Sequence, residues 1–275
     1  MIRYKIVASD LDGTLLDDNS EISLENMNAI TELYEKGVFF VPSSGRSFSE
    51  MPDEIKTSKY IRYLIASNGA VVFDKLTNDN IMMCMEKDFL KGILDILYSY
   101  RTHLTYRYNG NCYVDKEYYN EASYKYYNVW ECHIRVITEF GIPTENFKEE
   151  LYSLDNIEVI SIFFHSEKER LECKKRLLEH GGLQVVEACE NNLEIMSDKA
   201  GKGNALHKLC DKLGIDYNCT IAVGDSDNDA SIVKAAGLGL AVENARQSLK
   251  NVADAVACRN TENVVDYILK KYIEC

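Results

Sequence analysis

Residues 10–16 read Asp-Leu-Asp-Gly-Thr-Leu-Leu and follow, after Ser9, the apolar residues 6–8, Ile-Val-Ala. A short apolar, partly β-branched run is typical of a buried strand, and Gly13 indicates the turn that ends it. Asp10 and Asp12 are therefore expected at the carboxyl edge of an α/β sheet, where ligands bind. Two such carboxylates repel each other unless a cation lies between them or one takes a proton. The stretch favours metal-assisted chemistry. A capped turn between a strand and a helix, with both acids solvated, would have the same sequence pattern.

Three further segments place polar residues at a strand end or a helix start. Ser44-Gly45-Arg46 follows the apolar residues 38–41, Val-Phe-Phe-Val. Residues 224–229, Gly-Asp-Ser-Asp-Asn-Asp, follow Thr-Ile-Ala-Val in the same way. Lys202-Gly203 opens a predicted helix that ends at Gly214.

In their order along the chain, the four segments resemble the motifs of the haloacid dehalogenase-like (HAD) phosphatases. The resemblance covers nearly the whole chain, and the ordered set is far more specific than any one segment. Within that superfamily the chain is most similar to the Cof-type group, which carries a large type IIB cap domain between its second and third motifs. The resemblance implies a Rossmann-like, doubly wound and mostly parallel α/β sheet with an inserted α+β cap domain.

The rhythm of the chain predicts the same organisation. Strands alternate with helices at both ends of the sequence, which is typical of a parallel sheet. Between these ends, Asn109-Gly110 and Asn191-Asn192 indicate two hairpins. We therefore expect a discontinuous HAD-like catalytic core over residues 1–82 and 191–275, with an α+β cap domain over residues 83–190.

The first segment suits phosphoryl transfer, which needs a nucleophile and a proton for the leaving oxygen. Asp10 is the candidate nucleophile, giving an aspartyl-phosphate, and Asp12 is the candidate general acid that later activates water. The resemblance implies the same roles and adds the backbone carbonyl of Asp12 as a metal ligand. Related transport ATPases usually have threonine at this second position, whereas aspartate favours fast hydrolysis or transfer.

Asp225 and Asp229 straddle a strand end and a helix start, and both are candidate metal ligands. Mg²⁺ takes oxygen ligands, typically one or two carboxylates with phosphate and water. We expect Asp225 to bind the metal ion directly beside Asp10. Asp229 is expected to bind the ion through a water molecule, or to support its ligands without contacting the ion. Acids at a helix N-terminus could instead only favour its dipole. Asn228 is expected to steady the nucleophile or the phosphate.

Two segments offer groups for the phosphoryl oxygens. The Ser44 hydroxyl and the N–H groups beside Gly45 can bind a phosphoryl oxygen, with Ser43 as an adjacent competitor. Lys202 can place a compact positive charge there. Lys199, three residues earlier, is its rival, but only Lys202-Gly203 resembles the third motif of the family.

Further residues are expected on the substrate side of the site. Arg46 could contact the substrate or form a structural ion pair, and the two interpretations weigh equally. Asn68 with Gly69, and also Asn244, resemble Cof-type positions that line the core side of the site. Asn244 follows Glu243 where the family often has glycine, which puts the shape of that loop in doubt.

Composition limits the partners. The 275 residues include 31 Lys and Arg against 44 Asp and Glu, a net charge of −13. This balance disfavours nucleic acid, whose phosphates demand clustered positive charge, and an anionic membrane surface. The nine cysteines contain no CxxC pair and indicate reduced thiols. With no signal peptide and no long apolar run, we expect a cytoplasmic protein, monomeric or weakly homo-oligomeric.

The sequence as a whole predicts a Mg²⁺-dependent phosphatase, a phosphoric monoester hydrolase. Its partner is expected to be a small phosphorylated metabolite, with sugar phosphates as the leading class and pyridoxal phosphate and flavin mononucleotide (FMN) behind them. One alternative is a sugar phosphomutase. The other is a non-catalytic sugar-phosphate-binding regulator, which the presence of Asp10, Asp12 and Lys202 disfavours.

Overall fold

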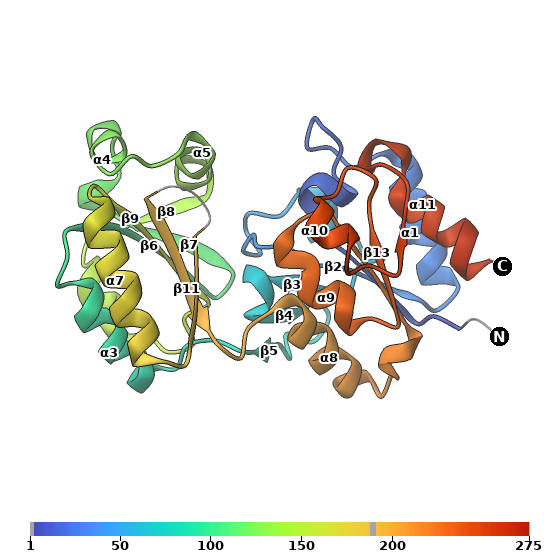
Figure 1. Cartoon of the computed structure of the whole chain (residues 1–275). Helices are drawn as coiled ribbons and strands as arrows, with labels where there is room; N and C mark the ends of the chain where they lie inside the picture. The colour runs from blue at the N-terminus through green and yellow to red at the C-terminus, as the bar shows by residue number, and fades with distance from the viewer. Residues whose placement is uncertain (1–2, 188–190, 275) are drawn as a thin grey trace. The chain divides into compact units, whose positions relative to one another are not determined.

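The computed structural model describes residues 3–187 and 191–274, and the chain divides into two compact units (Figure 1). The first unit comprises Met1–Gly45, Met51–Ile81 and Gly201–Cys275, and the second comprises Arg46–Glu50 and Met82–Ala200. None of the described helices is long and apolar enough to cross a membrane. The described cysteines are all free thiols, as the sequence predicted.

The first unit is built on a five-stranded parallel sheet in the order β14-β13-β12-β1-β2. Its strands are β1 (Ile6–Ser9), β2 (Phe39–Pro42), β12 (Thr220–Gly224), β13 (Leu238–Ala241) and β14 (Ala255–Val256). A smaller sheet has the order β3-β4-β5, formed by β3 (Tyr63–Ala66), β4 (Val71–Asp74) and β5 (Ile81–Met82). The central strands β1 and β12 are buried throughout, which explains why they read as continuous apolar runs.

Helices cover both faces of the parallel sheet (Figure 1). The helices of the first unit are α1 (Leu24–Glu35), α2 (Asp53–Thr57), α8 (Lys202–Leu213), α9 (Ala230–Ala235), α10 (Gln247–Lys250) and α11 (Val264–Ile268). Helix α1 packs against α11, and α8 packs against α9. The helix ends follow local signals: the Ser23 side chain accepts the Asn26 N–H at 3.1 Å, and Gly214 ends α8 in the left-handed conformation.

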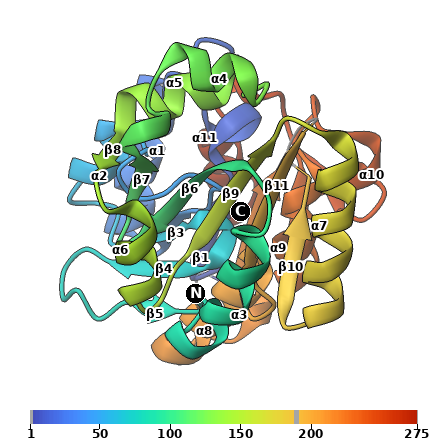
Figure 2. The ribbon, with the colours of Figure 1, turned by 90° about the vertical axis from the view of Figure 1, so that its left-hand side faces the viewer.

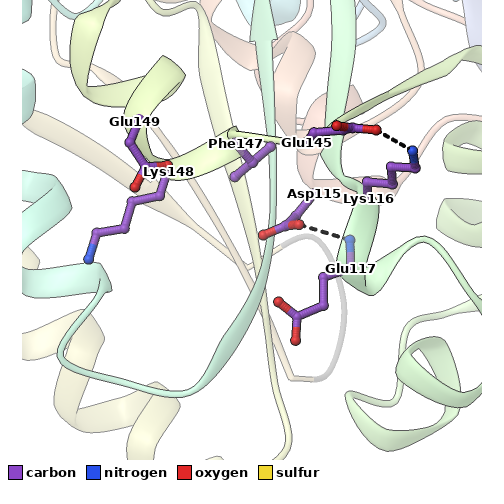
Figure 3. A pocket seen from close by; sticks show the side chains of 7 residues that line it. All are labelled: Asp115, Lys116, Glu117, Glu145, Phe147, Lys148 and Glu149. Carbon is purple, nitrogen blue, oxygen red and sulfur yellow. Dashed lines mark hydrogen bonds and ion pairs between the residues drawn. The ribbon is translucent and has the colours of Figure 1, made fainter.

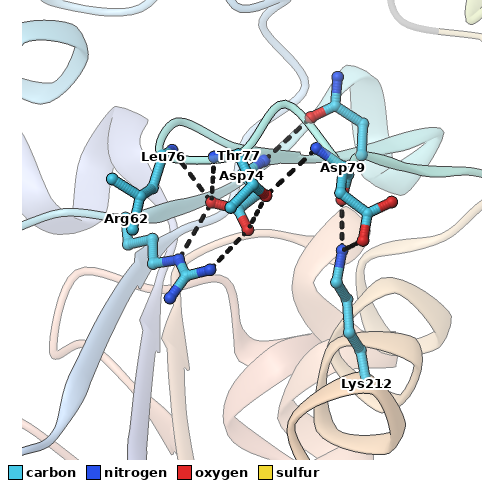
Figure 4. Close-up of polar contacts among 7 residues, drawn as sticks. Arg62, Asp74, Leu76, Thr77, Asp79 and Lys212 are labelled. Carbon is cyan, nitrogen blue, oxygen red and sulfur yellow. Dashed lines mark hydrogen bonds and ion pairs between the residues drawn. The ribbon is translucent and has the colours of Figure 1, made fainter.

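A polar network fixes the loop that follows β4 (Figure 4). The Asp74 carboxylate accepts two hydrogen bonds from the Arg62 guanidinium, at 3.0 and 2.9 Å. It also accepts the Leu76 N–H and the Thr77 hydroxyl, at 3.0 and 2.8 Å. Lys212 on α8 forms an ion pair with Asp79 of the same loop, at 2.8 Å. The network therefore ties the loop to the helix that begins with Lys202.

The second unit is built on a six-stranded, mostly antiparallel sheet in the order β10-β11-β9-β6-β7-β8. Its strands are β6 (Thr102–Tyr108), β7 (Asn111–Asp115), β8 (Gly141–Thr144), β9 (Val159–Phe164), β10 (Leu183–Val186) and β11 (Asn192–Ser197). Its helices are α3 (Lys87–Leu97), α4 (Glu121–Tyr126), α5 (Glu131–Phe140), α6 (Phe147–Ser153) and α7 (Glu167–His180). Helices α3 and α7 lie side by side against the sheet (Figure 2).

The predicted hairpin at Asn109-Gly110 is confirmed. Both residues have positive φ angles, 48° and 74°, and Tyr108 pairs with Asn111 across the turn. Positive φ at both central positions is the geometry that favours the Asn-Gly pair. Strands β10 and β11 also pair antiparallel, as the second predicted hairpin requires, although residues 188–190 between them lie outside the described part of the chain.

Besides a shift of one residue at Met82, which belongs to the second unit, the two units differ from the predicted domains at two places. Strand β11 pairs with β9, so residues 191–200 belong to the second unit and not to the predicted core. Arg46–Glu50 also belongs to the second unit, because Glu50 forms an ion pair with Arg107. Residue 190, where the predicted cap ends, lies outside the described residues. Pairing partners far along the sequence decide both differences.

His103 is buried in the second unit, in a cluster of aromatic rings. Its ring lies 5.7 Å from Phe163, 5.9 Å from Tyr124 and 6.1 Å from Tyr127, between ring centroids. Neither ring nitrogen has a hydrogen-bond partner among the described residues. Burial lowers the pKa of His103 to about 4, from 6.5 in the unfolded chain.

We expect His103 to weaken the protein in acid. As the pH falls below 6.5, His103 becomes protonated in the unfolded chain but stays neutral in the folded protein. The free energy of unfolding therefore declines until about pH 4. The difference in pKa corresponds to about 3 kcal/mol. Urea unfolding of His103→Phe and the wild type at pH 7.5, 5.5 and 4.5 measures it. The variant is expected to lose less stability across this range, and equal losses in both proteins would contradict the prediction.

Candidate active site

The first polar segment turns sharply where β1 ends. The Asp10 N–H donates to the carbonyl of Val223 on the neighbouring strand β12 at 3.0 Å, and the Asp10 side chain is buried. Gly13 has a φ of +79°, and a Cβ atom there would lie 2.9 Å from Oδ2 of Asp225. Glycine is therefore required both by the turn and by its close approach to Asp225.

Lys202 is the buried cation of the site. Its Nζ donates to Oδ1 of Asp10 and to Oδ1 of Asp229, both at 2.6 Å, and its side chain is 1% exposed. The rival Lys199 forms an ion pair with Glu86 at 3.6 Å, and both of these side chains are 70% exposed. The structure thus brings Lys202, and not Lys199, to the predicted nucleophile.

Asp10, Asp225 and Asp229 form one group. Each offers a carboxylate oxygen, and these oxygens all lie within 4.8 Å of one another. Oδ1 of Asp225 is buried and has no hydrogen-bond partner among the described residues. Oδ2 of Asp229, in contrast, accepts the N–H groups of Asp225 and Ser226, both at 3.1 Å. A group of carboxylate oxygens with one oxygen unpartnered fits a hard divalent cation.

The electrostatics of the group also call for a cation. Burial raises the pKa of Asp10 to about 8 and that of Asp225 to about 6, and the charge of Asp229 adds to both shifts. Burial alone would lower the pKa of Lys202, but Asp10 and Asp229 together hold it above its usual value. Three carboxylates against one ammonium leave two negative charges uncompensated when all are ionised. A divalent cation would cancel them and keep the acids deprotonated.

The second polar segment lies beside Asn68. Ser44 is buried at the end of β2, where its N–H donates to the carbonyl of Ile65 and its own carbonyl accepts the Asn68 N–H, at 2.9 and 3.0 Å. A Cβ atom on Gly45 would lie 3.1 Å from Oδ1 of Asn68. The Asn228 amide also donates to that oxygen, at 3.4 Å. Ser44, Gly45, Asn68 and Asn228 are thus brought together.

Other predicted residues have structural contacts. Gly69 gives room for the start of α8, because a Cβ atom there would lie 2.7 Å from the backbone nitrogen of Lys202. Asn244 donates to the Gly13 carbonyl at 2.8 Å and accepts the Asn260 N–H at 3.0 Å, so it braces the first turn. Arg46 lies in the second unit and donates to the Glu50 carbonyl at 3.1 Å. Asp12 has an exposed side chain outside the carboxylate group.

Asn260, which no sequence pattern indicated, supports the same turn. Its buried side chain donates to the carbonyl of Leu16 at 3.1 Å, while its N–H donates to Asn244. Gly224 ends β12 and is a second residue whose role was not predicted: a Cβ atom there would lie 2.5 Å from Cγ of Asp229. An asparagine in a surface-like segment carries no local signal, whereas a glycine at a strand end does signal a close approach.

A pocket in the second unit does not suit a phosphate ester (Figure 3). It is lined by Asp115, Lys116, Glu117, Glu145, Phe147, Lys148 and Glu149. Four carboxylates against two lysines give a net charge of −2, and Lys116 already pairs with Glu145 at 2.5 Å. An anionic ligand would be repelled there.

Comparison with known proteins agrees with this geometry. The sequence profile of the haloacid dehalogenase-like hydrolases matches residues 7–269. The phosphatase YwpJ of Bacillus subtilis is 33% identical, over 97% of this chain and 99% of its own. The 5-amino-6-(5-phospho-D-ribitylamino)uracil phosphatase YcsE of the same organism is 27% identical, over 99% and 97%. The solved structure of a haloacid dehalogenase-like hydrolase from B. subtilis is 30% identical, with a TM-score of 0.74 over 97% and 99%.

The chain belongs to the haloacid dehalogenase-like hydrolases, as a member of the Cof-type group. It is a phosphoric monoester hydrolase with an α/β core and an added cap sheet. The predicted superfamily, fold class and enzyme class are thereby confirmed. Hydrolases of this family use a divalent metal ion, and the group of Asp10, Asp225 and Asp229 is suited to hold one.

Proposed function

We propose that this enzyme is a Mg²⁺-dependent phosphatase that hydrolyses small phosphorylated metabolites through an aspartyl-phosphate on Asp10. The observation that carries the proposal is the buried contact of Lys202 with Asp10 and Asp229, beside the unpartnered oxygen of Asp225. It supports a site that binds a metal ion and a phosphoryl group together.

Asp10 is the nucleophile of the proposed reaction. Its carboxylate oxygen attacks phosphorus, and the bond to the ester oxygen breaks as Asp12 donates a proton to that oxygen. Asp12 then takes a proton from a water molecule, whose oxygen attacks the same phosphorus and breaks the bond to Asp10. Inorganic phosphate leaves, and both aspartates return to their starting states. The exposed side chain of Asp12 suits this exchange of protons.

The remaining residues hold the phosphoryl group in place. Lys202 orients the Asp10 carboxylate through Oδ1 and offers its charge to the phosphoryl oxygens, together with the groups of Ser44 and Gly45 and the Asn228 amide. When bound, Mg²⁺ would neutralise charge on these oxygens and on the carboxylates.

We propose that Asp225 binds Mg²⁺ directly, together with Asp10 and the Asp12 carbonyl. Asp229 supports these ligands without contacting the ion. The unpartnered Oδ1 of Asp225 supports a direct role. Both oxygens of Asp229 already accept hydrogen bonds, from Lys202 and from two backbone N–H groups. This contrast supports the division of roles between the two acids.

We place sugar and sugar-alcohol phosphates first among the substrates. The name of YcsE specifies a phosphate on a ribityl chain, which supports a polyol phosphate for this chain as well. FMN carries its phosphate on such a chain and follows, with pyridoxal phosphate after it.

Phosphate release from a panel of these esters tests the proposal. We expect release with Mg²⁺, a fall of about 100-fold or more in EDTA, and recovery when Mg²⁺ is restored. Release that EDTA leaves unchanged would contradict the metal. A folded protein that releases no phosphate from any ester, or that retains the phosphate on an isomerised sugar, would contradict the phosphatase and favour a regulator or a mutase.

A further inference from the structure

The turn Ser67–Gly69, which joins β3 to β4, has an unusual backbone. Its three residues, Ser67, Asn68 and Gly69, have positive φ angles of 51°, 53° and 88°. Glycine adopts this left-handed region without cost and asparagine tolerates it, whereas serine rarely enters it. Backbone in such conformations is concentrated at functional sites, where the surrounding structure maintains it. The conformation of this turn therefore calls for a functional explanation.

The turn contacts three of the four polar segments of the site. The Asn68 N–H donates to the Ser44 carbonyl at 3.0 Å, and Oδ1 of Asn68 accepts the Asn228 amide at 3.4 Å. A Cβ atom on Gly69 would lie 2.7 Å from the backbone nitrogen of Lys202, so the turn also packs against the start of α8. All of these residues belong to the first unit. The turn thus holds three segments of one compact unit together.

Two contacts set the orientation of the Asn228 amide. Its Oδ1 accepts the hydroxyl hydrogen of Ser226 at 2.6 Å, so its nitrogen is the atom that faces Asn68. An amide nitrogen carries two hydrogens. One is donated to Oδ1 of Asn68, and the second can be donated to an oxygen of the bound phosphoryl group.

The Asn68 carboxamide is packed against Gly45. A Cβ atom on Gly45 would lie 3.1 Å from Oδ1 and 3.3 Å from Nδ2 of Asn68. Both distances are shorter than ordinary van der Waals contact, so a side chain at position 45 would push the carboxamide away from Asn228. The absence of a side chain at Gly45 leaves the space that the carboxamide fills.

We propose that Asn68 is a positioning residue for phosphoryl binding: the left-handed turn holds its carboxamide against Gly45, and its Oδ1 orients the Asn228 amide toward the phosphoryl group. The proposal rests on the proposed function, in which Asn228 helps to hold that group. A donor acts on a phosphoryl oxygen only when held within about 0.5 Å of the productive geometry. Asn68 keeps one Asn228 N–H fixed without itself contacting the reacting atoms.

The test measures the binding of inorganic phosphate to the full-length protein by calorimetry with Mg²⁺, together with KM and kcat. We expect Asn68→Gly to raise the dissociation constant of phosphate and the KM by about tenfold, with a smaller effect on kcat, because Asn228 is misplaced before the reaction begins. Glycine adopts positive φ freely and keeps the N–H that bonds to Ser44, so the melting temperature should be retained. The change thus removes the carboxamide alone.

A second arm removes the group that Asn68 orients. Asn228→Ala should weaken phosphate binding at least as much as Asn68→Gly. In the Asn228→Ala protein, Asn68→Gly should then change the dissociation constant by less than about twofold, because the orienting contact is already lost. A merely structural role of Asn68 would weaken binding equally in both backgrounds. Equal losses, or unchanged phosphate binding by folded Asn68→Gly, would overturn the proposal.

Asn78→Gly is the matched control for a lost left-handed asparagine. Asn78 has a φ of 56° and is exposed in the loop that follows β4. Its replacement should leave phosphate binding within about twofold. A wild type that binds phosphate but hydrolyses no ester would overturn the proposed function, while the binding constants would still decide the role of Asn68. A wild type that binds no phosphate would overturn both.

Discussion

Replacing Asp10 by asparagine is expected to abolish phosphate release from every ester, by at least about 10⁴-fold. The amide cannot attack phosphorus, while its shape and its acceptor for Lys202 are retained. The fold should not suffer. Because burial holds the pKa of Asp10 near 8 against 3.8 in the unfolded chain, its ionisation destabilises the metal-free protein as the pH rises above 3.8. Thermal unfolding in EDTA at pH 8 should therefore show a variant at least as stable as the wild type.

Asp227→Asn is the matched control for this loss. Asp227 lies in the segment of residues 224–229, but its side chain is exposed. It pairs with Arg246 at 2.9 Å, outside the carboxylate group. The same change there should leave phosphate release within about twofold. Acid quenching of the wild type during turnover should trap phosphate on Asp10. An active Asp10→Asn protein, or phosphate trapped on another residue, would contradict the assigned nucleophile.

The group around Asp10 could be predicted because its members stand at strand ends and a helix start. Parallel strands share one carboxyl edge, so residues that follow β1 and β12 must lie close together whatever their separation along the chain. The hydrogen bond from Asp10 to Val223 is the direct expression of this rule. The choice of Lys202 over Lys199 required the family resemblance, because both lysines stand near the same helix start.

Contacts that depend on side-chain packing were not predictable in the same way. Gly69 resembled a substrate-side position, yet the space it leaves is filled by the backbone at Gly201 and Lys202. Asn260 reaches Leu16 across 244 residues, and no periodicity or turn signal marks such a contact. Local sequence determines which element forms, whereas the partners of an exposed-looking polar residue depend on how the elements pack.

The extent of the second unit was mispredicted for a related reason. The sequence of Arg46–Glu50 shows no break from the segment before it, and the decisive partner of Glu50 lies 57 residues away on β6. Two residues of opposite charge at that separation are too common to indicate a pair. The pair of Glu50 and Arg107 can be identified only from the folded structure, in which the hairpin of β6 and β7 positions Arg107.

Lys202→Met is expected to reduce phosphate release by on the order of 10³-fold, because it removes the cation that orients Asp10 and faces the phosphoryl oxygens. It should also destabilise the metal-free protein by about 3 kcal/mol, since it leaves buried carboxylates without their partner. Lys199→Met is the control. That side chain is 70% exposed, so its loss should change neither activity nor stability measurably.

Mg²⁺ should separate the two effects of Lys202→Met. If Asp10, Asp225 and Asp229 hold the ion, its charge replaces part of what the ammonium supplied, and the melting temperature of the variant should rise more with Mg²⁺ than that of the wild type. Activity should not recover, because Mg²⁺ cannot hold Oδ1 of Asp10 at the position that the 2.6 Å contact with Nζ defines. Equal stabilisation of both proteins by Mg²⁺ would argue against a metal ion in this group, and recovered activity would argue against an orienting role for Lys202.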